Sequence, residues 1–261
     1  MSFAFTQAAS VADAAQKISG DAQLLAGGQS LLAAIKLGLA MPEALVDLGG
    51  LAELQGMALN GKTLSIGAMT RHAEVAASPV VRQAIPALAD LAGRIGDRQV
   101  RNRGTLGGSL ANNDPAACYP AAVLGLGASI ETNQRTIAAD DFFLGLYETA
   151  LNEGEIIQAV HFPLPDQAAW QKFKQPASRF SLVGVFVSRT GGAVRVAVTG
   201  AGPCVFRVAA LEQALAADWS AAAAQKVSVS SAGLNTDLHG SADYRAALIP
   251  VLAGRAVAAA G

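Results

Sequence analysis

The stretch Arg101-Asn-Arg-Gly-Thr-Leu-Gly-Gly-Ser-Leu-Ala-Asn-Asn-Asp114 decides how we expect this chain to fold. A shorter relative, Ala26-Gly-Gly-Gln-Ser30, lies upstream, also beside an apolar run. Turns of this kind leave backbone N–H groups unpaired and pointing one way, which forms a site for an anion. Glycine allows positive φ and lets the backbone approach a ligand closely. Two such turns indicate a clamp on a diphosphate, whereas one alone is usually a plain tight turn.

Neither turn fits the usual phosphate motifs. The chain has no G-x-G-x-x-G after a strand and no G-x-x-x-x-G-K-S/T, so a Rossmann site and a P-loop are both poorly supported. Three arginines, Arg98, Arg101 and Arg103, stand near the second turn. Arginine suits a diphosphate or the carboxylates of a partner, and a solvated loop is the equally weighted alternative.

The two motifs, in this order, resemble those of the FAD-binding (medium) subunit of the molybdenum hydroxylases, the family of xanthine dehydrogenase and aerobic carbon monoxide dehydrogenase. That family carries A-G-G-Q/H-S near its start and T-I/L-G-G-S/N later, which here are Ala26–Ser30 and Thr105–Ser109. The resemblance covers nearly the whole chain. Further matching segments are residues 65–70, 154–157, 162–163, 172–173, 178–180 and 199–202.

The resemblance implies an α+β fold. We expect a two-lobed α/β FAD-binding domain of the vanillyl-alcohol-oxidase (PCMH) type over residues 1–165, with lobes at about 1–56 and 57–165. A small domain with a three-stranded antiparallel sheet and a helix bundle would follow over residues 166–261. The sequence Pro163-Leu-Pro165 marks the expected boundary.

Local patterns predict the elements. Ser10 and Asp13 form the ends of a capping box, and Asn60-Gly61 is a strong hairpin signal. Short helices are expected to open at Thr70 and at Ser78-Pro79. The other expected helices are residues 10–20, 30–37, 86–94, 119–126, 207–216, 220–227 and 244–259. The expected strands are residues 23–26, 45–48, 57–59, 63–66, 127–132, 135–138, 155–162, 170–173, 183–189 and 194–199.

The resemblance also implies a cofactor site for non-covalent FAD. The first loop would hold the diphosphate with its backbone amides, and residues 104–109 would close over the diphosphate and the ribityl chain. Asn112 and Asp114 would reach ribityl or adenosine hydroxyls, and Lys172 is a candidate for the flavin side. The full expected set is Ala26, Gly27, Gly28, Gln29, Ser30, Leu31, Gly104, Thr105, Gly107, Gly108, Ser109, Asn112, Asp114, Cys118 and Lys172.

The resemblance makes the chain an oxidoreductase subunit that transfers electrons. FAD would take electrons from a small 2Fe–2S subunit and pass them to NAD, a quinone or O₂. Substrate would react at a molybdenum cofactor in a large third subunit, in a dimer of heterotrimers. The substrate and the terminal acceptor are not given by this sequence. No catalytic side chain is assigned, because a cofactor carries the hard chemistry in such proteins.

Composition excludes several other classes. The 261 residues have a net charge of −1 and 5% aromatics, which argues against nucleic-acid binding. No apolar run reaches membrane-spanning length and no signal peptide is evident, so cytoplasm is the expected location. Two cysteines and three histidines are scattered without metal spacing, so we expect reduced thiols and no metal or iron–sulfur cluster in this chain.

Two other functions stay open at this point. The first is a flavin enzyme that acts alone, which would need a histidine for covalent flavin attachment or its own base in a substrate pocket; neither is evident. The second is an interaction subunit that has lost its flavin. The intact Gly-Gly loops argue against that loss, whereas Cys118 argues slightly for it.

Cys118 departs from the family pattern. Relatives commonly have Asp or Glu four residues after the aspartate of Asp114-Pro115, and a thiol is a poorer hydrogen-bond acceptor than a carboxylate. Either the flavin affinity is lower here, or Asp114 or Asn113 substitutes. We expect Cys118→Asp to tighten FAD binding or to leave it unchanged. A marked loss of affinity in an FAD titration would contradict this.

Overall fold

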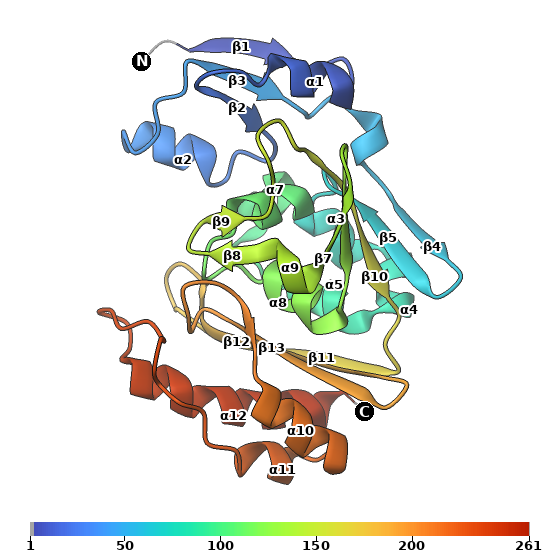
Figure 1. Ribbon diagram of the computed structural model, residues 1–261, viewed down its shortest axis with the longest axis vertical. Coiled ribbons are helices and arrows are strands. Elements are labelled where there is room, and N and C mark those ends of the chain that lie inside the picture. The colour runs from blue at the N-terminus through green and yellow to red at the C-terminus, as the bar shows by residue number, and fades with distance from the viewer. Residues whose placement is uncertain (1–2, 261) are drawn as a thin grey trace.

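The computed structural model describes residues 3–260, which form three tiers from the N-terminal sheet at the top to the C-terminal helices at the bottom (Figure 1). The top tier is a parallel sheet of strand order β1-β3-β2 with two helices. Ser10 caps the first helix by accepting from the Asp13 N–H at 3.0 Å, as predicted. The elements of this tier are β1 (Ala4–Gln7), α1 (Val11–Lys17), β2 (Ala22–Leu25), α2 (Leu31–Lys36) and β3 (Ala44–Asp47).

The middle tier is built on an antiparallel five-stranded sheet of order β4-β5-β10-β6-β7. The predicted Asn60-Gly61 turn joins β4 to β5, and Gly61 has the positive φ of +59° that such a turn requires. The strands of this sheet are β4 (Met57–Asn60), β5 (Thr63–Gly67), β6 (Ser129–Thr132), β7 (Thr136–Ala138) and β10 (Ile157–Pro163). A separate two-stranded hairpin consists of β8 (Phe143–Gly145) and β9 (Glu148–Thr149). The helices are η1 (Ala52–Leu54), α3 (His72–Ala77), α4 (Pro79–Ala84), α5 (Pro86–Gly93), α6 (Arg98–Arg103), α7 (Leu106–Asn112), α8 (Tyr119–Leu126) and α9 (Ala139–Phe142).

The bottom tier is an antiparallel sheet of order β11-β12-β13-β14 with three helices beneath it (Figure 1). Both faces of β12 are buried. Phe186 packs toward the fully buried helix α8, whereas Val185 and Val187 pack toward α12. The elements are β11 (Gln167–Lys174), β12 (Ser181–Thr190), β13 (Ala193–Thr199), β14 (Phe206–Arg207), α10 (Ala209–Ala217), α11 (Ala221–Gln225) and α12 (Ala242–Ala259).

Some expectations need correction. The C-terminal sheet has four strands, because Phe206 and Arg207 pair with β13. A strand of two residues is too short to show an alternating pattern, and Arg207 was expected to open the helix that begins at Ala209. The segments of α6 and α7 were expected as loops. The elements β1, β8, β9 and α9 were not predicted either.

A buried carboxylate ties the turn before β10 to the β6–β7 turn. Glu155 accepts hydrogen bonds from the Thr132 hydroxyl at 2.8 Å, from Nε of Arg135 at 3.0 Å and from the Asn152 N–H at 2.8 Å. The hydrogen bond from Arg135 is the main cause that lowers the pKa of Glu155 to about 2. The ionised form is therefore favoured by the fold.

The ion pair of Glu155 with Arg135 predicts how the free energy of unfolding depends on pH. A carboxyl whose pKa is lowered on folding stabilises the fold above its unfolded pKa, and that contribution is lost as the pH falls from about 4.5 toward about 2. Glu155→Gln should lower the free energy of unfolding at neutral pH by on the order of 2 kcal/mol and flatten this part of the acid profile. Urea unfolding across the acid range measures both effects.

Glu153→Gln is the matched control, because Glu153 is exposed and makes no hydrogen bond within residues 3–260. Its stability profile should follow that of the unmodified chain. If the free energy of unfolding depends on pH in the same way for Glu155→Gln and the unmodified chain, ionised Glu155 does not stabilise the fold as predicted.

Candidate functional site

The first Gly-Gly loop follows β2 and leads into α2. None of the backbone N–H groups from Ala26 to Ser30 donates to another residue in the described range of 3–260. Gly28 has a φ of +72°, in the left-handed region that glycine tolerates. Ser30 is the N-cap residue of α2, but its side chain makes no capping hydrogen bond and the residue is exposed. The loop therefore presents unused donors, as an anion requires.

The two loops touch through their backbones. A Cβ at Gly27 would overlap the carbonyl oxygen of Arg103 and lie 2.7 Å from Cα of Gly104. A Cβ at Gly108 would lie 3.3 Å from Cβ of Ala26. Figure 1 shows α7 beneath the N-terminal sheet, so the second loop meets the first where the top and middle tiers join.

The second loop is not a row of free amides. The N–H of Leu106 donates to the Thr70 carbonyl at 3.1 Å, and the N–H of Gly107 donates to the Ala68 carbonyl at 2.8 Å. The N–H of Gly108 donates to the hydroxyl of Thr105, the N-cap of α7, at 3.2 Å. This loop uses its amides to hold the start of α7 against the end of β5, and it supports the first loop.

Side chains of α7 and of the residues after it place further polar groups next to the two loops. Ser109 and Asn112 are half-buried, and their side chains make no hydrogen bond within the described residues. Asp114 accepts from the Ala116 N–H at 2.8 Å through Oδ1 and from the Tyr147 hydroxyl at 3.4 Å through Oδ2. These three side chains leave polar atoms available next to the loops.

Asn113 has a structural task that its sequence context did not reveal. It ends α7 with a φ of +42°, and its buried amide group donates to the carbonyls of Gly145 at 2.9 Å and Glu148 at 2.7 Å. It therefore anchors the β8–β9 hairpin. Of the two residues suggested to replace an acidic group at Cys118, Asn113 has an Oδ1 that is buried without a hydrogen-bond partner in the described residues, whereas Asp114 is half-buried.

Cys118 and Lys172 face each other at the junction of α8 and β11. Nζ of Lys172 donates to Sγ of Cys118 at 3.3 Å and to the Arg94 carbonyl at 2.9 Å. Ser181 Oγ lies 3.6 Å from the same sulfur. Sequence reasoning placed both residues at the cofactor but did not foresee their contact.

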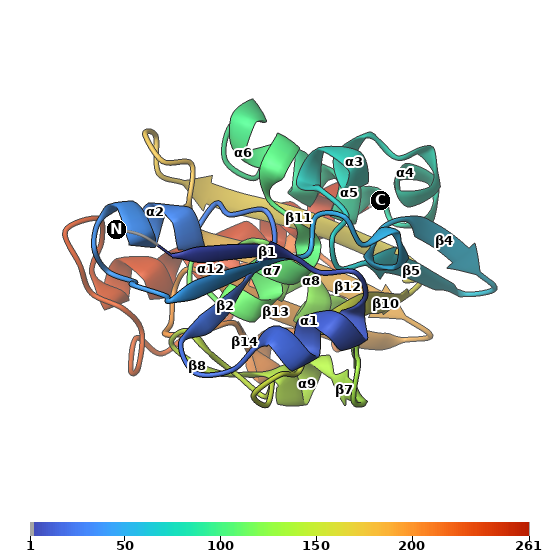
Figure 2. The same cartoon turned by 90° about the horizontal axis from the view of Figure 1, so that it is seen from above.

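The three arginines near the second loop lie on a helix. Figure 2 shows α6 projecting from the molecule, and Arg98 and Arg103 are exposed upon it. Arg101 instead donates to the carbonyls of Ile95 at 2.8 Å and Gly96 at 3.1 Å, so it holds the loop before α6. Arg98 and Arg103 make no side-chain hydrogen bond in the described part of the chain and stay available for an anion or a partner.

His72 was passed over as one of three scattered histidines. Its backbone N–H donates to the Gly104 carbonyl at 2.9 Å, and its ring lies 5.3 Å from that of Tyr119. Burial, with the positive charge of Arg101 as a second cause, lowers the pKa of His72 to about 4. A neutral imidazole therefore lies under the second loop at physiological pH. A lone histidine carries no sequence signal for such a role.

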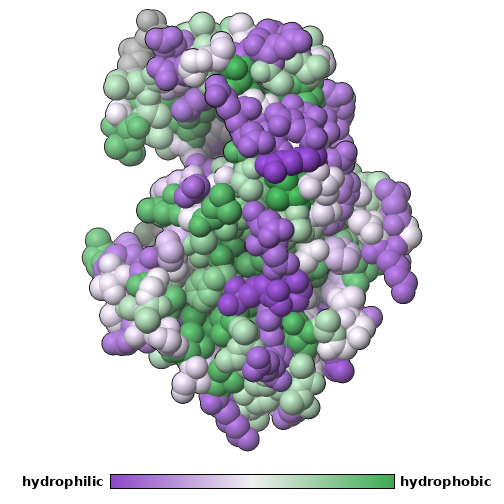
Figure 3. Space-filling view, in the orientation of Figure 1, coloured by the Kyte–Doolittle hydropathy of each residue, from purple (hydrophilic) through white to green (hydrophobic). Residues whose placement is uncertain are grey.

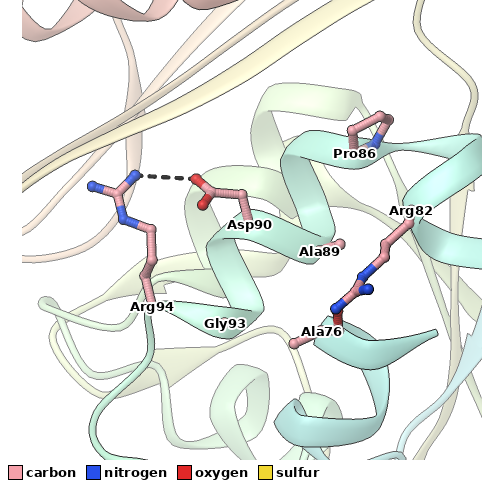
Figure 4. A pocket seen from close by; sticks show the side chains of 7 residues that line it. All are labelled: Ala76, Arg82, Pro86, Ala89, Asp90, Gly93 and Arg94. Carbon is pink, nitrogen blue, oxygen red and sulfur yellow. Dashed lines mark hydrogen bonds and ion pairs between the residues drawn. The ribbon is translucent and has the colours of Figure 1, made fainter. Parts of the chain in front are cut away.

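The surface is hollowed between the top and middle tiers, on the side of α2 and β8–β9 (Figure 3). Exposed apolar side chains occur near both elements: Leu37, Leu39 and Met41 follow α2, whereas Leu144 and Leu146 belong to the hairpin. A separate open pocket of about 370 Å³ lies on α5 (Figure 4). It contains none of the expected cofactor residues; its lining is Ala76, Arg82, Pro86, Ala89, Asp90, Gly93 and Arg94.

Residues 3–260 contain neither a metal-binding cluster nor a membrane-spanning helix. No group of three or more His, Cys, Asp or Glu side chains is placed to hold a metal ion in this range. The same part of the chain has no helix of the length and apolar character that crossing a membrane requires. Both cysteines are free, and Cys118 is buried whereas Cys204 is half-buried.

Comparisons with known proteins agree with this architecture. Residues 1–165 match the family model of the FAD binding domain in molybdopterin dehydrogenase. The chain is 35% identical over 260 residues to the carbon monoxide dehydrogenase medium chain of Hydrogenophaga pseudoflava, covering 94% of this chain and 91% of that one. It is 36% identical over 274 residues to the nicotine 6-hydroxylase medium subunit of Paenarthrobacter nicotinovorans, covering 98% and 96%.

Solved structures show the same likeness. Carbon monoxide dehydrogenase from Hydrogenophaga pseudoflava matches with a TM-score of 0.89 at 35% identity, covering 100% of this chain and 97% of that one. Quinoline 2-oxidoreductase from Pseudomonas putida 86 matches with a TM-score of 0.89 at 30% identity, with coverage of 100% and 97%. The fold and these matches define a flavin-binding component of a multi-subunit oxidoreductase. The chain belongs to the family of FAD-binding medium subunits of the molybdenum hydroxylases.

The contact between the loops gives a direct test. Gly27→Ala should lower FAD affinity by about tenfold or more, because the added methyl group pushes the first loop off the Arg103–Gly104 backbone. FAD titration of the cofactor-depleted complex measures the loss. Gly93→Ala is the matched control, because its Cβ would lie at an ordinary 3.7 Å from Ala76. Equal affinities in the two variants would refute the clamp.

Proposed function

We propose that this chain holds FAD non-covalently between its two Gly-rich loops and transfers electrons from a 2Fe–2S subunit to a terminal acceptor, which is NAD, a quinone or O₂. The observation that carries the proposal is the row of unused N–H groups from Ala26 to Ser30, held against the second loop. Five consecutive free donors beside glycines fit the two phosphates of a dinucleotide.

The residues divide into groups by what they offer to FAD. The first-loop amides and the Ser30 hydroxyl bind the diphosphate. Ser109, Asn112 and Asp114 offer a hydroxyl, an amide and a carboxylate to the ribityl or ribose hydroxyls. Thr105, Gly107 and Gly108 fix the start of α7 and allow the loops to meet.

The flavin supplies an acceptor and donor of one or two electrons when it is bound, and the protein supplies binding and orientation. Lys172 and Cys118 remain part of the proposed site, because they support the segment of chain that carries Asp114. Pro115 and Ala117, which link Asp114 to Cys118, accept hydrogen bonds from the Thr199 hydroxyl at 2.8 Å and 2.7 Å. The bottom sheet thus holds the segment that carries the candidate acceptors.

The partners form part of the proposal. The relatives are medium chains and a medium subunit, so we infer a large molybdenum-cofactor subunit and a small 2Fe–2S subunit, as a dimer of heterotrimers. The exposed apolar side chains after α2 and in the β8–β9 hairpin support covering of this surface by a partner. We also propose a division into a FAD-binding domain over residues 1–165 and a C-terminal domain over residues 166–261, because the family model matches residues 1–165.

The test begins with the absorption spectrum of the purified complex and chromatography of the cofactor that heat releases. We expect a flavin spectrum and intact FAD, equimolar with this chain. A colourless protein that also fails to take up added FAD would overturn the proposal.

The direction of electron flow needs a second measurement. The complex is reduced with dithionite and mixed separately with NAD, a soluble quinone and O₂, while the flavin absorbance is followed. Reoxidation by one acceptor, which is lost in the FAD-depleted complex and restored by added FAD, supports transfer through this chain. Equal reoxidation with and without FAD would place the exit of electrons elsewhere.

A further inference from the structure

Two nucleophilic side chains from different tiers meet in a buried place. Cys118 stands at the N-terminus of α8 with 5% of its surface exposed, and Lys172 lies on β11 with 8% exposed. Their reactive atoms, Sγ and Nζ, are 3.3 Å apart. This is a contact between two ionisable groups, and neither belongs to an exposed surface.

The other polar neighbours of the pair are neutral, and Oγ of Ser181 lies 3.6 Å from the Cys118 sulfur. Lys172 makes no ion pair with a carboxylate anywhere in residues 3–260; its other partner is the neutral carbonyl of Arg94 at 2.9 Å. The thiolate is the form of cysteine that reacts with oxidants, and Nζ of Lys172 lies within hydrogen-bond distance of the Cys118 sulfur.

We propose that hydrogen peroxide joins Cys118 to Lys172 through a reversible sulfur–nitrogen bond, a sulfenamide that ties α8 to β11. The chemistry depends on this contact and not on bound flavin, so it stands apart from the proposed electron transfer. Peroxide is the oxidant, and a small thiol is the reductant that reverses the link.

The first step oxidises the sulfur. The Cys118 thiolate attacks one oxygen of hydrogen peroxide, the O–O bond breaks, and the sulfur becomes sulfenic acid. The departing hydroxide takes a proton from the Lys172 ammonium group and leaves as water. Sulfur loses two electrons, peroxide gains them, and the lysine becomes a neutral amine. The step thus produces the nucleophile that the next step needs.

The second step forms the link. The Lys172 amine attacks the sulfenic sulfur, the S–O bond breaks, and the hydroxyl leaves as water with one amine proton. Sulfenic acids condense with nearby nitrogen nucleophiles in this way. An amine held at 3.3 Å competes well against thiols from solution, because its reaction with the sulfenic sulfur is intramolecular. Two molecules of a small thiol return Cys118 and Lys172 and form one disulfide.

The experiment treats the purified complex with hydrogen peroxide, denatures it, alkylates free thiols and digests it with trypsin. Trypsin does not cut after a modified lysine, so the link joins residues 104–135 to residues 136–174. We expect this joined species at the summed mass less two hydrogens, together with loss of the alkylated Cys118 peptide. Dithiothreitol should reverse both changes.

Two controls separate the link from general oxidation. Lys172→Arg keeps the positive charge but removes the nucleophilic amine, so Cys118 should be trapped as sulfenic acid by dimedone and no link should form. Cys204, which has no lysine partner in the described residues, is the internal control within the same chain and should form no link to lysine.

Three outcomes would overturn the proposal. The first is a free Cys118 thiol at a peroxide concentration that oxidises Cys204. The second is Cys118 converted to sulfinic acid without a joined peptide. The third is a joined peptide heavier by one oxygen, which would be an N–O–S bridge and not the direct bond. The experiment on the unmodified complex is decisive even if Lys172→Arg fails to fold.

Discussion

The close approach of two backbones at Gly27 is the constraint on which the candidate site depends. Arg103 and Gly104 cannot move aside for a side chain there, because the Gly104 N–H donates to the Val100 carbonyl at 2.7 Å and its carbonyl accepts from His72 at 2.9 Å. The first loop must therefore adapt to the second. A residue without a Cβ at position 27 lets the loop lie against this fixed segment with its own amides unused.

The fixed segment is itself held by the middle and bottom tiers. The Gly107 N–H donates a hydrogen bond to the Ala68 carbonyl after β5, and the Asn113 side-chain amide donates hydrogen bonds to the β8–β9 hairpin. Pro115 accepts from Thr199 and Gly200 at the end of β13. The chain from residue 104 to residue 118 thus crosses the molecule and is anchored at each stage. This explains why a flavin-binding chain carries a C-terminal sheet that lies away from the two loops.

Much of this arrangement was predictable where local chemistry and tertiary packing agree. Asn60-Gly61 gave the hairpin because that dipeptide favours positive φ, and the uninterrupted apolar run 119–126 gave a buried helix. The α7 helix was missed because Leu-Gly-Gly-Ser has low helix propensity. It forms because Thr105 caps it and because Ala68 and Thr70 bind its first amides, which are contacts across more than thirty residues that no local pattern reveals.

The same limit applies to the site. Both Gly-rich segments were recognisable, since free donors beside glycine have a sequence signature, and the family relationship inferred from them is confirmed. Their unequal roles were not recognisable, because the partners of the Leu106 and Gly107 amides come from the end of β5. The contact of Cys118 with Lys172 was hidden for the same reason: it joins two tiers, and the position of each residue is set by the packing of α8 on the bottom sheet.

The similarity to subunits of other enzymes also indicates whether this chain is suited to select a substrate. Its relatives belong to enzymes named for carbon monoxide, nicotine and quinoline, at identities between 30% and 36%. Those compounds differ widely in size and polarity, yet the carbon monoxide and quinoline enzymes both match this fold with a TM-score of 0.89. A backbone common to such different enzymes is suited to a shared cofactor and not to one substrate. In the function proposed above, the unused amides of the first loop bind the anionic group of that shared cofactor, and the second loop holds the first in place.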